Sequence, residues 1–88
     1  MRVQITENGI TVLKGSKTTT DAASIHVPAA IGTATVSVGW VDSAGTFNAY
    51  TDGVLAAGES AKFSTGASVP LAINIASFST VFDIEVGI

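Results

Sequence analysis

Apolar and polar residues alternate along much of the chain, and a period of two predicts β-strands. The clearest case is residues 33–41, where one face collects four apolar side chains: Ala34, Val36, Val38 and Trp40. Residues 69–76 and 80–88 repeat this pattern. We therefore expect three half-buried strands, with 33–41 in the centre of the core. The short linker Ser77, Phe78, Ser79 predicts that the last two strands are antiparallel neighbours.

Two dipeptides indicate tight turns. Asn8-Gly9 separates two segments of alternating character, and Asn-Gly favours a type I′ turn because both central residues need a positive φ. We therefore predict a hairpin over residues 2–13. Asp52-Gly53 gives the same signal after a strand candidate at 46–51, and the residues from Asp42 to Gly45 predict the turn before that strand.

The remaining segments are short. Residues 14–23 are too polar for a core strand and predict a loop or an exposed edge, whereas 24–27 and 60–65 predict short strands. Residues 54–61 allow at most one helical turn. Seven or eight strands at a spacing of roughly 8 to 12 residues are typical of a sandwich or small barrel. We predict one all-β domain over residues 1–88, an antiparallel β-sandwich or jelly-roll-like fold.

The predicted core consists of the inward-facing apolar residues of these strands. They are Val36, Val38, Trp40, Phe47, Leu71, Ile73, Ile75, Phe82, Ile84 and Val86. Tyr50 lies three residues after Phe47, so a regular strand places it on the opposite, exposed face.

The chain carries little charge. Only 12% of its 88 residues are charged, against about 25% in an average domain. Four Lys and Arg residues against seven Asp and Glu residues give a net charge of −3, which excludes a basic surface for nucleic acid or an anionic membrane. There is no cysteine, hence no disulfide, thiolate metal site or thiol nucleophile. No apolar stretch approaches the ~20 residues of a membrane-spanning helix, and the residues after Met1 favour a chain made in the cytoplasm without a signal peptide.

Residues that could carry chemistry have few partners in the sequence. His26 is the only histidine, and without cysteine or a nearby carboxylate it predicts a structural or surface role rather than a metal ligand. Asp42, Asp52 and Glu59 lie in successive turns; two carboxylates are the minimum for glycoside hydrolysis, and three could bind Ca²⁺. Turn capping is the favoured role of both aspartates. We expect no enzyme, cofactor or metal site.

The composition favours contacts between subunits. The chain has 13 Ala, 11 Thr, 9 Ser and 9 Gly residues, together 42 of 88, which leaves few charges to keep copies apart. A domain of this size without disulfides or metal gains only a few kcal/mol from its own core, so further burial in a homo-oligomer is expected. The candidate interface residues are Val54, Leu55, Ala56, Ala57 and Ile88.

Tyr50 and Asp52 support an alternative. An exposed aromatic ring beside a carboxylate can form a ligand platform for a sugar ring. This alternative predicts a monomeric carbohydrate-binding or adhesive module.

Three segments of the chain resemble parts of the small β-sandwich proteins of tailed-phage virions. They are Val36-Ser-Val-Gly-Trp-Val-Asp-Ser-Ala-Gly-Thr-Phe47, Tyr50-Thr-Asp-Gly53 and Phe82-Asp-Ile-Glu-Val86. The resemblance covers residues 33–88. It implies a structural component of the virion, such as a capsid decoration protein, the base of a head fibre or a tail component. It also implies a trimer that docks on other virion proteins such as the major capsid protein. The resemblance carries over no catalytic residue.

Overall fold

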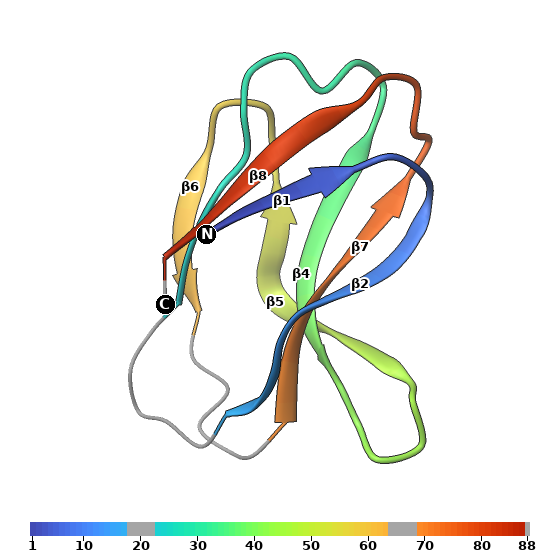
Figure 1. Ribbon diagram of the computed structural model, residues 1–88, viewed down its shortest axis with the longest axis vertical. Helices are drawn as coiled ribbons and strands as arrows, with labels where there is room; N and C mark the ends of the chain where they lie inside the picture. Colours follow the sequence, from blue (N-terminus) through green and yellow to red (C-terminus); the bar gives the residue numbers. More distant parts are fainter. Residues whose placement is uncertain (18–22, 64–68, 88) are drawn as a thin grey trace.

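Two antiparallel four-stranded sheets make up the computed structural model, which describes residues 1–17, 23–63 and 69–87 (Figure 1). The strands are β1 (Arg2–Ile5), β2 (Gly9–Lys17), β3 (Ala23–His26), β4 (Thr35–Val41), β5 (Phe47–Leu55), β6 (Ser60–Phe63), β7 (Val69–Ala76) and β8 (Phe82–Gly87). Sheet A has the order β1-β8-β3-β6, and sheet B has the order β2-β7-β4-β5. The predicted all-β sandwich is confirmed, and this strand order is that of an eight-stranded jelly roll. The described residues contain no helix that could cross a membrane.

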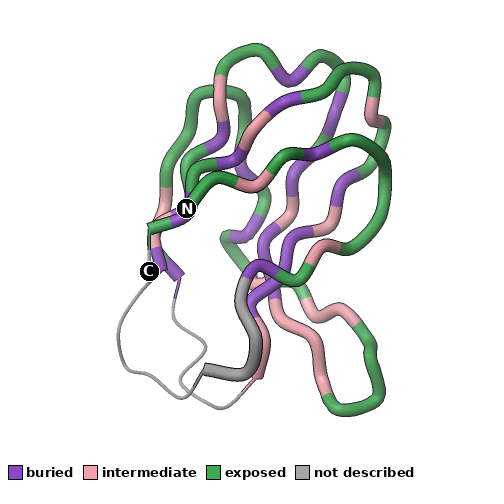
Figure 2. Tube along the Cα trace, in the orientation of Figure 1, coloured by how far each residue is buried: buried purple, intermediate pink, exposed green. Residues whose placement is uncertain are grey.

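The core lies between the sheets and is built from alternate residues of each strand. In β8, for example, Phe82, Ile84 and Val86 are buried while Glu85 is exposed. Figure 2 shows this alternation along the chain. The prediction is confirmed for eight residues: Val36, Val38, Leu71, Ile73, Ile75, Phe82, Ile84 and Val86. The rest of the core consists of Ile5, Leu13, Ala23, Ile25, Val27, Ile31, Ala34, Leu55 and Phe63.

The predicted hairpin over residues 2–13 is wrong. β1 pairs with β8 in sheet A and β2 pairs with β7 in sheet B, so Asn8-Gly9 carries the chain from one sheet to the other. The predicted pairing of the last two strands is wrong for the same reason, because β7 and β8 lie in different sheets. Asn8 Oδ1 accepts a hydrogen bond of 2.7 Å from the backbone N–H of Phe78. This bond joins the connection between β1 and β2 to the connection between β7 and β8, and both connections pass from one sheet to the other. Gly9 has a φ of 119°, so the glycine supplies an unusual backbone angle without closing a hairpin.

β5 contains an irregularity where a second hairpin turn was predicted. Ser37 of β4 pairs with Val54 of β5, and Gly39 pairs with Ala49. The paired positions are therefore two residues apart in β4 but five residues apart in β5. Asp52 and Gly53 lie inside this irregularity, in the middle of a strand. A Cβ at Gly53 would overlap the carbonyl oxygen of Val38, so glycine is needed here for close backbone approach rather than for a turn.

The predicted faces of β5 are exchanged. Phe47 pairs with Val41, and directly opposite residues of an antiparallel pair share a face, so both lie on the outer face of sheet B. Phe47 covers Gly39, where an added Cβ would lie 2.7 Å from Phe47 Cζ. Tyr50 therefore points inward, where it is half-buried and packs against the core instead of lying exposed.

Trp40 also lies outside the core cluster, although it shares the inward face of Val38. It is half-buried. Figure 1 shows the reason: the turn end of the β4–β5 hairpin projects away from sheet A, so an inward side chain there has no opposite sheet to cover it. The prediction of Trp40 and Phe47 as core residues is therefore wrong.

Two segments for which the sequence predicted no definite strand, residues 14–23 and 54–61, are partly β-strand in the described part of the structure. β2 continues to Lys17 along the edge of sheet B, in line with the predicted exposed edge, and residues 18–22 lie outside the described residues. Residues 54–61 form the end of β5, a tight turn and the start of β6, without a helical turn. The backbone N–H of Gly58 donates to the carbonyl of Val27 at 2.9 Å and fixes this turn against the end of β3.

Candidate functional site

The outer face of sheet A carries charged and polar residues. A row runs across four strands: Arg2 lies opposite Glu85, Glu85 opposite His26, and His26 opposite Ser60. Asp83 and Lys62 lie on the same face in the adjoining positions. Part of this row borders an open depression of about 530 Å³. All four residues of the row are exposed, so the face is solvated.

The row in sheet A contains a serine, a histidine and a carboxylate, which the sequence does not bring together. His26 Nδ1 and Ser60 Oγ form a hydrogen bond of 2.5 Å, and Arg2 Nε donates to Glu85 Oε1 at 2.7 Å. The hydrogen bond and charge of Glu85 raise the pKa of Arg2. Nucleophilic serine chemistry needs a carboxylate that orients the histidine in a site that excludes water. Here the carboxylate is held by Arg2, and the Arg2 and Glu85 side chains are 67% and 48% exposed. We assign the row a role in surface solvation.

The three acidic residues singled out in the sequence do not converge. Asp42 lies in the β4–β5 turn and Glu59 in the β5–β6 turn, at opposite ends of the sandwich, while Asp52 lies within β5 (Figure 1). Glu59 Oε1 accepts the backbone N–H of Ala56 at 2.5 Å and closes its own turn. In the described part of the chain, no three His, Asp or Glu side chains are grouped as a metal site would require.

Asp42 caps the predicted turn. Its Oδ1 accepts the backbone N–H groups of Ala44 and Thr46, each at 2.9 Å, and its Oδ2 accepts the amide of Asn48 at 3.3 Å. The hydrogen bond from Thr46, followed by that from Asn48, lowers the pKa of Asp42 because each favours the charged carboxylate. The turn also has Gly45 at a φ of 83°, a conformation that favours glycine. The capping role predicted for Asp42 is confirmed.

Tyr50 and Asp52 border one open depression of about 350 Å³ between the edge strands β5 and β6. Lys62 and Phe63 of β6 line the same depression. The rings of Tyr50 and Phe63 are stacked, with centroids 5.3 Å apart and an interplanar angle of 14°. Burial raises the pKa of the Tyr50 hydroxyl. The sequence singled out the two β5 residues but not the two from β6, because only the packing of the sheets brings these edges together.

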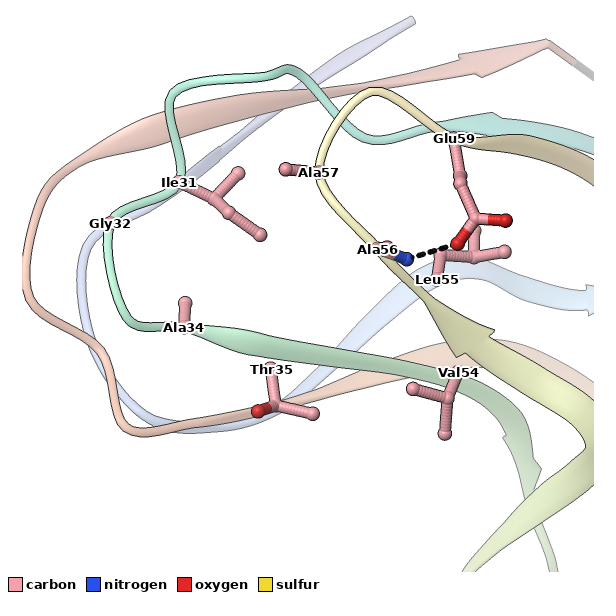
Figure 3. Close-up of a pocket in the computed structure, with 9 residues that line it drawn as sticks. All are labelled: Ile31, Gly32, Ala34, Thr35, Val54, Leu55, Ala56, Ala57 and Glu59. Carbon is pink, nitrogen blue, oxygen red and sulfur yellow. Dashed lines mark hydrogen bonds between the residues drawn. The ribbon is translucent and has the colours of Figure 1, made fainter.

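Val54 and its neighbours line a second depression, of about 420 Å³ (Figure 3). Val54 is 65% exposed, and Ala56 and Ala57 are exposed as well. Leu55, in contrast, belongs to the core and is only 5% exposed, so it adds little to the surface of this depression. The fifth candidate, Ile88, lies outside the described residues.

The outer face of sheet B carries no charge over two complete rows. The first row runs across the four strands through Ile10, Asn74, Ser37 and Val54. The second row runs through Val12, Ala72, Gly39 and Ala49. We call these eight residues the uncharged face. Its exposed apolar side chains lie on the two edge strands: Ile10 is 49% exposed, Val12 50% and Val54 65%.

Comparison of the chain with protein-family models, with curated proteins and with solved structures gives no match. The surfaces described above are therefore the basis for a functional proposal. The uncharged face of sheet B and the depression at Tyr50 are the two surfaces whose side chains suggest a binding partner.

Proposed function

We propose that the protein is a non-enzymatic structural subunit that works by binding copies of itself. The uncharged face carries this proposal. It presents apolar side chains from both edges of sheet B, with Asn74 and Ser37 between them, while the opposite sheet carries Arg2, Glu85 and their charged neighbours. The sandwich therefore has one face suited to solvent and one suited to contact with another protein surface.

Burial of the uncharged face has a low desolvation cost. Burying an unpaired charge costs several kcal/mol, whereas hydroxyl and amide groups recover their hydrogen bonds when they meet one another. Each Å² of apolar surface removed from water contributes about 25 cal/mol. Ile10, Val12 and Val54 are each about half-exposed or more in the single chain, so these three side chains would contribute most on association.

The resemblance of residues 33–88 to small tailed-phage proteins supports placing the assembled subunits in a virion, next to other virion proteins such as the major capsid protein. The jelly-roll strand order is compatible with this role, since jelly rolls form viral capsid and lectin domains. Because one fold serves many functions, the surface and not the fold supports the proposal.

Light scattering coupled to size-exclusion chromatography tests self-association. We expect a mass of twice 8.8 kDa or a larger multiple at micromolar concentrations. Val54→Lys places a charge on the uncharged face and is expected to weaken association at least about tenfold, because the ammonium would be buried without a partner. Gln4→Lys is the matched control: it adds the same charge to the outer face of sheet A and should leave the mass unchanged. A mass of 8.8 kDa for the unaltered chain throughout this range would overturn the proposal.

A second candidate function is sugar binding at Tyr50. The observation that favours it is the gathering of a stacked aromatic pair, a carboxylate and an ammonium around one depression. Sugars combine an apolar ring face, which packs on aromatic rings, with hydroxyl groups that bond to charged side chains. Asp52 and Lys62 carry opposite charges, so the depression suits a neutral ligand rich in hydroxyl groups.

A glycan array followed by titration of any bound sugar tests this second candidate. Tyr50→Ala is expected to weaken binding at least about tenfold, whereas Tyr50→Phe keeps the stacked ring and should bind nearly as well. Since Tyr50→Ala also removes packing on Phe63, Asp52→Asn is the second variant: it keeps the shape of an exposed side chain and should weaken binding through loss of a charged acceptor. Absence of any binding by the unaltered chain would exclude this function.

A further inference from the structure

The uncharged face has the same chemical order when read from either edge of sheet B. In the first row, Ile10 on β2 and Val54 on β5 are apolar, and the two inner residues, Asn74 on β7 and Ser37 on β4, are polar. In the second row, every position is a small or apolar residue. A face with this order is complementary to itself after a half-turn.

We infer that two copies of this chain pack face to face through sheet B, related by a two-fold axis that runs parallel to the strands between β7 and β4. The inference rests on the proposed self-association and specifies its contact. The axis exchanges the two halves of the sheet, so β2 lies over β5 of the partner subunit and β7 over its β4. Such a contact is isologous, because the same surface is used by both subunits.

The pairing matches side chains by their chemistry. Ile10 faces Val54 of the partner subunit, and Asn74 faces Ser37 of the partner subunit, where the amide can donate to the hydroxyl. Each contact occurs twice. In the second row, Val12 faces Ala49 of the partner subunit. In this row Ala72 is fully buried and Phe47 covers Gly39, so the contact there is made by the exposed Val12 and Ala49.

A second copy is the occupant that best explains this order. Neither row of the face contains a charged residue, so the paired side chains themselves bury no charge. A foreign partner would need only a complementary surface, and nothing would require Ile10 at one edge to be matched by Val54 at the other. In a two-fold contact that match is necessary, since each edge meets the opposite edge of the other subunit.

The absence of cysteine from the chain allows a direct test, because introduced thiols are the only ones present. Ile10→Cys and Val54→Cys are prepared as separate proteins, mixed in equal amounts, allowed to exchange subunits and treated with a short bifunctional thiol reagent that bridges the spacing of about 10 Å between packed sheets. We expect a cross-linked dimer that contains one chain of each variant. Each variant alone should give at least about tenfold less dimer. In that case the two thiols would lie at opposite edges of the contact, where strand spacing adds a lateral separation of about 14 Å to the spacing between the sheets.

A control on the other sheet and a mass measurement complete the test. Gln4→Cys mixed with Val54→Cys should give no more dimer than either variant alone, because Gln4 lies on sheet A. If the unaltered chain has a mass of 8.8 kDa, both the proposed function and this inference fail. If the mass is twice 8.8 kDa or more but the mixed dimer is absent, self-association stands and the face-to-face two-fold contact is overturned. Efficient cross-linking of Ile10→Cys to itself would also overturn it, because the proposed contact places the two copies of Ile10 at opposite edges.

Discussion

Gly53→Ala is expected to remove most of the stability of the fold. A Cβ at this position would overlap the carbonyl oxygen of Val38 and lie 3.0 Å from the carbonyl oxygen of Tyr50. Both are backbone atoms within the β4–β5 pair, so neither can move without disturbing strand pairing. Overpacking costs about 1–3 kcal/mol, and more where backbone must shift; we expect about 3 kcal/mol or more. A small domain without disulfides or metal has a stability of about 3–5 kcal/mol, so this loss removes more than half of it.

Urea denaturation followed by the fluorescence of Trp40, the single tryptophan, measures the effect. Gly58→Ala is the matched control. Gly58 has a φ of 81° but no atom within 4 Å of an added Cβ, so alanine there meets only backbone strain, which costs about 1–2 kcal/mol. Equal unfolding midpoints for the two variants would show that Gly53 is not closely packed against β4.

Ile73→Ala is expected to destabilise the fold by about 2–5 kcal/mol. Ile73 is fully buried, and β7 lies between β2 and β4, so Ile73 pairs with Thr11 on one side and Val38 on the other. Removal of three carbon atoms leaves a cavity that paired strands on both sides cannot close. The cost therefore includes lost packing as well as lost burial.

The control for Ile73→Ala is Ile10→Ala, the same change on the neighbouring strand. Ile10 is 49% exposed on the outer face, so at concentrations low enough for the measured mass to be that of one chain the free energy of unfolding should fall by about 1 kcal/mol or less. Chemical denaturation of both variants gives the comparison. A loss for Ile10→Ala as large as that for Ile73→Ala in the monomer would contradict the assignment of the two faces of sheet B.

Local sequence was sufficient where the physical cause of a structure is local. Alternation with a period of two requires one apolar face per strand, so β4, β7 and β8 and their eight core residues could be predicted. The Asp42 turn could be predicted because its hydrogen bonds join residues only two to six positions apart. The all-β class follows from the same strand pattern and from the lack of any long helical segment.

Strand pairing depended on contacts between distant parts of the chain. Asn8-Gly9 and Asp52-Gly53 favour unusual backbone angles or close approach, but neither dipeptide specifies which strand lies alongside. β1 pairs with β8 and β2 with β7 because each strand must bury its apolar face in the one shared core, which local turn preference cannot represent. For the same reason the two faces of β5 were exchanged: alternation alone is unchanged by a slip of one residue, and only pairing with β4 selects the inward side.

The candidate sites show the same division. The low charge of the chain and the exposure of Val54 could be predicted from composition and pattern, because they depend on residue types. The rows that define the two outer faces join residues from four strands, and the depression at Tyr50 needs Lys62 from another sheet. Residues so far apart in the chain become neighbours only after the jelly roll has set the strand order. The reason is that each row is formed by side chains on neighbouring strands, which are distant from one another in the sequence.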